Sequence, residues 1–299
     1  MVRDYSMRFL LVLTFILSAC ASIVPTVAPV QEATAAPLAD LSVDQLENAQ
    51  YQLGTRDDHA VVQLADGKFQ QGVDTVDYAS IVLSDFVAIG DLNGDGVNEA
   101  AAIFFENYGG TGNFAMLAIY VNVNDAPVFL TSVLIDDRPM INGIAIENGE
   151  LYLDAVTHSF DDPACCPTLP TTRRYALTQN QLRIIYYSTN TADGKKREIE
   201  ITTPAQAAEV SGNVQVSGSV SIAPFENNLS YFIYDEAGNQ YAVGPVTVTA
   251  PDFGAPGTFD FNVAFESIPA GTVVYLEIQD ISAADGSWLA MDAVKLLVK

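Results

Sequence analysis

Short segments in which apolar and polar residues alternate fill the chain from about residue 50 to its end. Turn-forming residues separate them, as at Asp66-Gly67, at Asn148-Gly149 and near Asn180. Asn-Gly and Asp-Gly are typical of tight β-hairpins, because both residues tolerate a positive φ. A period of two residues indicates strands that bury one face. The pattern therefore predicts an all-β chain built mainly of antiparallel sheets.

One helix is expected before the first strand. Ser42-Val43-Asp44-Gln45 has the form of a capping box and is followed by the apolar Leu46. We therefore predict a single short helix over about residues 43–50.

Composition bounds the classes of function. The 299 residues suggest two domains, and 49% hydrophobic with 17% charged residues excludes global disorder. Thirteen basic against thirty-seven acidic residues give a net charge of −24. Phosphate backbones would be repelled, so nucleic-acid binding is excluded, and a cationic partner or a metal ion is favoured.

The N-terminal segment has the form of an export signal. Arg3 and Arg8 flank its start, and the apolar run 9–17 is too short to span a bilayer. It ends in Leu17-Ser18-Ala19-Cys20, which resembles the bacterial lipoprotein box. That resemblance implies cleavage after residue 19, lipidation of Cys20 and an extracytoplasmic protein held on a membrane by its acyl chains, at the cell surface or on the periplasmic face. The alternative is an ordinary signal peptide with a coincidental cysteine.

The rest of the chain divides into three parts. Residues 20–40 are rich in Ala, Pro, Thr and Val and are expected to form an extended tether. Residues 41–197 are expected to form an antiparallel β domain. The basic cluster 195–197 marks the boundary, after which residues 198–299 start a second set of strands.

The last hundred residues resemble a known family. The motifs that carry the resemblance occur in one order along the chain: Ile201-Thr202-Thr203-Pro204, Val210-Ser211-Gly212, Val216-Ser217-Gly218, Pro224-Phe225-Glu226, Asp235-Glu236-Ala237-Gly238, Gly257-Thr258-Phe259 and Ile281-Ser282-Ala283-Ala284-Asp285-Gly286. This series is similar to the immunoglobulin-like domain of bacterial spore germination proteins. The resemblance implies an extracytoplasmic accessory or binding module and no catalyst. The germination and sporulation domain usually found beside it is not recognisable here, so a spore role stays open.

The residues of this region independently favour a β-sandwich. About seven short alternating segments are separated by Gly, Pro or Asp turns, as such a fold requires. Two strands present an apolar residue at every second position, and we expect these residues to face the core: Phe259, Phe261, Val263 and Phe265 in one, Leu229, Tyr231 and Ile233 in the other.

Residues 91–99 have the spacing of a calcium loop. Asp91, Asn93 and Asp95 stand at positions 1, 3 and 5, followed by a glycine at 6 and a carbonyl, that of Val97, at 7. Ala102 stands where an EF-hand needs its glutamate, which excludes a standard EF-hand. Glu99 instead makes the run similar to the shorter inter-strand loops of FG-GAP-type calcium repeats. The predicted ligands of a structural Ca²⁺ are therefore Asp91, Asn93, Asp95, the Val97 carbonyl and Glu99, with water completing the shell.

The alternative for this loop is a metal-free hairpin in which Asx turns cap the backbone. The motif occurs once, which argues against a propeller of such repeats.

Cys165 and Cys166 are adjacent and lie among prolines. With Cys20 lipidated, they are the only thiols left in an oxidising compartment. A disulfide between the two neighbours, a pair of free or buried thiols, and a redox site all stay open.

No catalytic constellation is recognised. His158, Ser159 and Asp161 are too close in sequence to converge as a triad, and His59 is the only other histidine. The glycine-rich run 109–112 lacks the Lys and Ser/Thr of a phosphate loop and is expected to be a hairpin turn. We therefore expect a lipoprotein with no enzymatic activity that binds or scaffolds a protein or cell-envelope polymer. The alternative is a secreted or surface hydrolase with a carboxylate-based site on residues 41–197.

Overall fold

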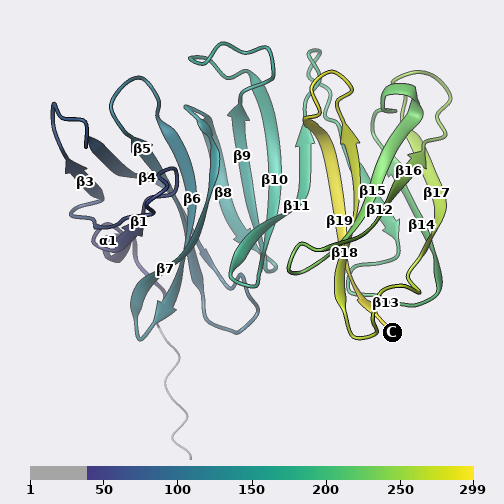
Figure 1. Cartoon of the computed structure of the whole chain (residues 1–299), viewed down its shortest axis with the longest axis horizontal. Coiled ribbons are helices and arrows are strands. Elements are labelled where there is room, and N and C mark those ends of the chain that lie inside the picture. The colour runs from purple at the N-terminus through teal and green to yellow at the C-terminus, as the bar shows by residue number, and fades with distance from the viewer. Residues whose placement is uncertain (1–38) are drawn as a thin grey trace, which may run out of the picture. The chain divides into compact units, whose positions relative to one another are not determined.

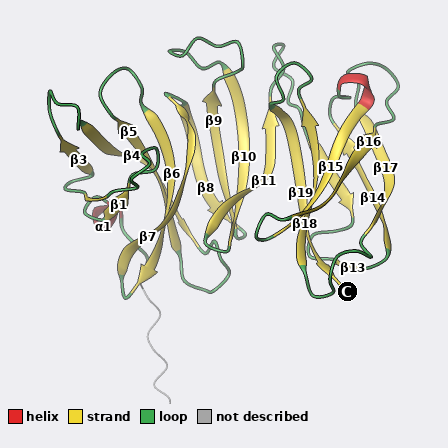
Figure 2. Ribbon diagram, viewed as in Figure 1, coloured by secondary structure: helices red, strands yellow, loops and turns green. Residues whose placement is uncertain are grey.

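The protein is described here by a computed structural model that covers residues 39–299. Strands make up almost all of this region, as Figure 2 shows, and the expected all-β class is confirmed. Residues 39–299 contain one α-helix, α1, which spans Val43–Leu46. Its capping box is present, with Ser42 Oγ accepting from the Gln45 N–H at 3.3 Å and Gln45 Oε1 accepting from the Ser42 N–H at 2.8 Å. The helix ends four residues earlier than expected because the chain enters a strand at Gln50.

Five antiparallel strands form the first large sheet, in the order β3-β4-β5-β6-β7 (Figure 1). Their bounds are β3 (Lys68–Gln71), β4 (Ala79–Gly90), β5 (Glu99–Asn107), β6 (Phe114–Val123) and β7 (Ala126–Asp137). A small pair, β1 (Gln50–Gln52) and β2 (Val61–Gln63), packs with α1 against one face of this sheet. The core between them is centred on Leu46, Tyr51, Phe104 and Tyr120.

A second sheet has nine strands and runs through most of the remaining chain. Its order is β16-β15-β18-β19-β11-β10-β9-β8, and β13 pairs with β19 in parallel. The bounds are β8 (Met140–Glu147), β9 (Glu150–Thr157), β10 (Leu169–Thr178), β11 (Gln181–Thr189), β13 (Glu209–Val210), β15 (Asn228–Asp235), β16 (Gln240–Thr247), β18 (Val273–Ile281) and β19 (Trp288–Val298). The predicted turn at Asn148-Gly149 joins β8 to β9 with φ of 53° and 76°, as a tight hairpin requires.

Strands β8 to β11 cover the other face of the five-stranded sheet. The side chains between the two layers include Ile103, Leu117, Leu151, Leu153 and Tyr175, all buried. Strand β5 is therefore covered on both faces, which explains why its small residues alternate between two cores.

The C-terminal part is a β-sandwich. Strands β12 (Ile199–Thr203), β14 (Asn213–Val220) and β17 (Gly257–Ala264) form a three-stranded sheet, and the short 3₁₀ turn η1 (Phe225–Asn227) precedes β15. This sheet packs against β15, β18 and β19 of the larger one. The expected core is confirmed: Leu229, Ile233, Phe259, Val263 and Phe265 are buried, and Tyr231 and Phe261 pack against them half-buried.

The boundary expected near residue 197 lies on the connection between β11 and β12, but a hydrogen-bonded ladder crosses it. Tyr186, Tyr187 and Ser188 of β11 pair with Asp292, Met291 and Ala290 of β19. The described residues, 39–299, accordingly belong to one compact unit. In residues 39–299 no helix is long and apolar enough to cross a bilayer.

Candidate functional site

The calcium-type loop connects β4 to β5, as expected from its apolar flanks. Gly94 and Gly96 have φ of +80° and +84°, so the turn needs residues that tolerate the left-handed region. A Cβ at either position would meet nothing within 4 Å, so backbone conformation alone explains these glycines.

Asp91 and Asp95 cap the backbone of the loop. The Asp91 carboxylate accepts from the N–H groups of Gly94 at 2.7 Å and Gly96 at 3.0 Å. Asp95 Oδ1 accepts from the Val97 N–H at 2.8 Å. These are Asx-type contacts, which stabilise a tight turn without a metal.

Glu99 is the buried member of the group, with 1% of its surface exposed. Its Oε2 accepts from the N–H groups of Leu92 at 2.9 Å and Asn93 at 3.2 Å. The Asn93 side-chain amide donates to Glu99 Oε1 at 3.0 Å and to Asp95 Oδ2 at 3.1 Å. An amide N–H₂ group thus bridges two carboxylates at the centre of the loop.

The electrostatics of Glu99 favour a positive charge beside it. Burial raises the pKa of Glu99, two backbone N–H groups lower it, and the carboxylates of Asp95 and Asp91 raise it, so the net shift is upward. A hard cation between these oxygens would relieve the repulsion, and carboxylate, amide and carbonyl oxygens are the donors that Ca²⁺ takes.

The predicted ligands thus lie in the loop and at the first residue of β5, and the side-chain oxygens of Asp91, Asn93, Asp95 and Glu99 already accept from backbone or amide N–H groups. Within the described part of the chain, no three or more His, Cys, Asp and Glu side chains form a group that could hold a metal ion. The fit to calcium therefore rests on the donor set, and binding would require the Asn93 amide to rotate away from the carboxylates. Calcium at this loop stays a prediction.

The same loop borders the C-terminal sandwich. A cavity of about 270 Å³ is lined by Asn93 and Gly94 from the loop, by Glu150 from β9, and by Tyr275 and Lys295 from β18 and β19. The chain has two β regions, residues 41–197 and the C-terminal sandwich of residues 198–299. A change in the order of the loop can therefore affect the junction between these two β regions.

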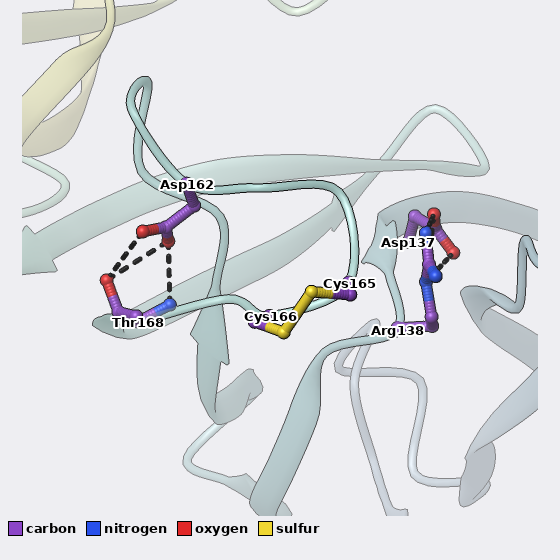
Figure 3. Close-up of a disulfide and its surroundings, with 6 residues drawn as sticks. All are labelled: Asp137, Arg138, Asp162, Cys165, Cys166 and Thr168. Carbon is purple, nitrogen blue, oxygen red and sulfur yellow. Dashed lines mark hydrogen bonds and ion pairs between the residues drawn. A yellow bond between two sulfur atoms is a disulfide. The ribbon is translucent and has the colours of Figure 1, made fainter.

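Cys165 and Cys166 form a disulfide with each other in the loop between β9 and β10 (Figure 3). Both cysteines are exposed. Asp162 organises this loop, because its carboxylate accepts from the N–H groups of Ser159 at 2.9 Å and Thr168 at 2.7 Å. Those bonds, with one from the Thr168 hydroxyl, lower the pKa of Asp162 to about 2.

The two histidines have structural contacts. His158 Nδ1 lies 3.0 Å from Asp136 Oδ2, and the same oxygen accepts from the His158 N–H at 2.6 Å. Desolvation works to lower the pKa of His158, but the bond to Asp136 and its charge raise it, and the net shift is upward. His59 Nδ1 lies 3.2 Å from the Leu53 carbonyl oxygen. Neither contact assembles a triad with Ser159 or Asp161.

Cys20, the predicted lipidation site, lies outside the described residues, as do the predicted signal peptide and most of the tether. The glycine-rich run 109–112 lies between β5 and β6, two strands, as a hairpin turn requires.

A cleft at the junction of the two β regions was missed by the sequence reasoning. It has a volume of about 760 Å³ and is lined by residues of β10, β11, β12, β14, β17 and β19. Its charged and aromatic lining comprises Arg174, Tyr186, Glu198, Glu200 and Asp292. These residues are more than one hundred positions apart at the extremes, and no local spacing links them.

The comparison with protein families identifies the C-terminal part. Residues 198–287 match the immunoglobulin-like domain of bacterial spore germination. The match begins one residue before β12 and ends just before β19, the strand that joins the sandwich to β11. This region of the chain is therefore a spore-germination-type immunoglobulin-like domain, and the resemblance drawn from its motifs is confirmed. No curated protein sequence matches the chain.

Proposed function

We propose that the protein is a membrane-anchored extracytoplasmic lipoprotein with a non-catalytic binding or scaffolding role, and that Ca²⁺ stabilises its 91–99 loop. The strongest support is the immunoglobulin-like domain at residues 198–287, because modules of this architecture present loops and sheet faces from a rigid frame. The anchor is supported by the lipoprotein-type sequence that ends at Cys20.

The continuous sheet supports a scaffolding role. Three residue pairs of the ladder join β11 to β19, and Arg183 of β11 binds Glu277 of β18 at 2.5 Å. The guanidinium of Arg183 also lies 4.5 Å from the ring centroid of Tyr275. A buried ion pair and a shared ladder oppose independent motion of the two β regions, so a ligand held by one is positioned relative to the other.

Calcium would act on the first β region through its loop. The metal would bind the folded loop and not the unfolded chain, so at one hundred times the dissociation constant the gain is about 2.7 kcal/mol. Magnesium should do less, because it requires a near-ideal octahedron that this set of oxygen donors does not impose.

The test is calorimetry on the full chain, titrated with calcium after chelation. We expect binding heat and a rise in melting temperature, both largely lost in Asp95→Ala. Asp57→Ala, at an exposed aspartate outside the loop, is the matched control and should keep the calcium-dependent rise. If millimolar calcium gives neither heat nor a shift, the metal-free hairpin is the correct description of the loop.

A surface hydrolase is the second candidate function. The observation that favours it is the junction cleft, where burial raises the pKa of the Asp292 carboxyl to about 6 and Glu198 and Glu200 line the same space. An active site in the junction cleft would lie at the edge of the region 41–197 and not within it. Release of reducing ends from a cell-envelope polysaccharide, lost in Asp292→Asn, would favour the enzyme.

A further inference from the structure

The junction cleft has a fixed carboxylate in its wall. Asp292 is 7% exposed, and its Oδ2 accepts from the Ile201 N–H at 2.8 Å. Arg174 Nη2 lies 3.4 Å from its Oδ1, while Arg174 Nη1 binds Glu150 Oε2 at 3.0 Å. The Arg174 guanidinium also lies 4.6 Å from the ring centroid of Tyr186. The wall is therefore held in place before any ligand arrives.

The cleft carries a surplus of negative charge. Its lining has three carboxylates and one guanidinium, hence −2 when all are ionised. Lys196 binds Glu198 at 2.8 Å and reduces this to −1, while Arg174 divides its charge between Glu150 and Asp292. The remaining attraction for a cation lies at Glu200, which is exposed, and Asp292.

Glu200 and Asp292 line the same cleft, and Ile201, the residue after Glu200, donates its backbone N–H to Asp292 at 2.8 Å. Burial is the main cause that raises the pKa of Asp292, and the negative charge of Glu200 adds to it. A cationic group between Glu200 and Asp292 would offset their negative charges. The net charge of −24 on the chain also attracts cations.

The rest of the lining suits a polyhydroxylated ring. Ser219, Thr249 and Thr258 supply hydroxyl groups, and Pro251 and Pro256 supply apolar surface. A pocket of about this size, with apolar walls and a few fixed polar groups, is typical of small-molecule sites. Neither a flat apolar patch nor a purely acidic surface would offer this combination.

The geometry points to a binding site for an amino sugar with a free amino group, whose ammonium lies between Glu200 and Asp292 and whose hydroxyl groups meet Ser219 and Thr258. This binding site rests on the binding role proposed above and adds to it a location in the fold and a class of ligand.

The test is isothermal titration of the full chain in detergent with three disaccharides. These are the β-1,4-linked glucosamine dimer, its N-acetylated form and cellobiose. We expect the glucosamine dimer to bind at least about ten-fold more tightly than the other two, because only it carries ammonium groups. A dipeptide of two lysines serves as a fourth probe with the charge but without the sugar ring.

Three variants locate the site. Glu200→Gln keeps the shape of an exposed side chain and should weaken binding of the glucosamine dimer about ten-fold. Glu266→Gln removes the same charge from an exposed position outside the cleft lining and should leave binding unchanged. Ser219→Phe should block the cleft for all sugars, and its melting temperature shows whether it has folded.

Equal affinity for the three disaccharides, equal effects of Glu200→Gln and Glu266→Gln, or no sugar binding at millimolar concentration would each overturn the assignment. Tighter binding of the lysine dipeptide would overturn it as well, because the ammonium alone would then suffice. Cleavage of the bound dimer would contradict the non-catalytic role and leave the binding site standing, so the two failures are distinguishable.

Discussion

Asp292, near the C-terminus, accepts a hydrogen bond from the backbone N–H of Ile201, the middle residue of strand β12, at 2.8 Å. Strand β12 is an edge strand of the three-stranded sheet, so this N–H lies on the side that has no neighbouring strand in that sheet. A buried carboxylate thus satisfies an edge donor and places a charge at the edge, which opposes the addition of a further strand.

Asp292 should make stability depend on pH in a defined direction. Burial raises its pKa from 3.8 to about 6, the Ile201 N–H and Arg174 act against this, and Glu200 adds to it. The folded state therefore holds the proton more tightly than the unfolded state. The resulting stability is complete below about pH 4 and is lost as the pH rises through about 6, a change of about 3 kcal/mol.

The measurement is urea unfolding at several pH values, compared between the wild type and Asp292→Asn. Asp137 and Asp162, whose pKa values are lowered, and His158, whose pKa is raised, add to the pH dependence of both proteins outside this range, so the difference between the two proteins is the informative quantity. The difference should vary with pH between 4 and 6 and be flat above, and a constant difference would contradict the assignment.

Arg183 should contribute strongly to the junction. Its partner Glu277 has a side chain only 5% exposed, so Arg183→Ala leaves a buried charge without its cation. We expect a loss of roughly 3–5 kcal/mol in the free energy of unfolding, measured by urea denaturation.

The matched control is Lys195→Ala, which breaks a pair whose side chains are 72% and 61% exposed. Solvent screens such a pair, so its removal should leave the free energy of unfolding nearly unchanged. Similar losses in the two variants would show that the Arg183 pair is no more stabilising than a surface contact.

Residues 198–299 expressed alone should melt cooperatively, because their strands enclose a core of their own. We expect a lower melting temperature than that of the full chain, since the fragment loses the β11 ladder and the cation that faces Glu277. Circular dichroism during heating is the measurement, and a fragment without a cooperative transition would contradict independent folding.

Cys20→Ser should release the protein from membranes or leave its signal uncleaved, because the single predicted lipid attachment is removed. Fractionation of cells followed by mass spectrometry of the mature N-terminus is the measurement. An unmodified wild-type N-terminus beyond Cys20 would contradict the lipoprotein prediction.

The features that the sequence determined by itself are those encoded locally. The capping box at Ser42 and the turn at Asn148-Gly149 depend on residues within four positions of one another, so each could be predicted from the chain alone. The alternation of Phe259, Val263 and Phe265 likewise fixed which face of a strand is buried. The ordered series of short motifs between Ile201 and Gly286 was enough to predict the immunoglobulin-like domain.

The tertiary structure decided which distant residues meet. Glu106, an acidic residue in a strand, gives no local sign that it is fully buried. Its carboxylate accepts from the Tyr51 hydroxyl at 2.6 Å, the Gly54 N–H at 2.8 Å and the Thr55 hydroxyl at 2.7 Å, all more than fifty residues away. The junction cleft and the β11–β19 ladder likewise bring together residues that are far apart in the sequence. The local sequence pattern specifies strands and turns. The pairing of strands that are far apart in sequence is fixed only when the whole chain packs, because buried polar groups must then find hydrogen-bond partners.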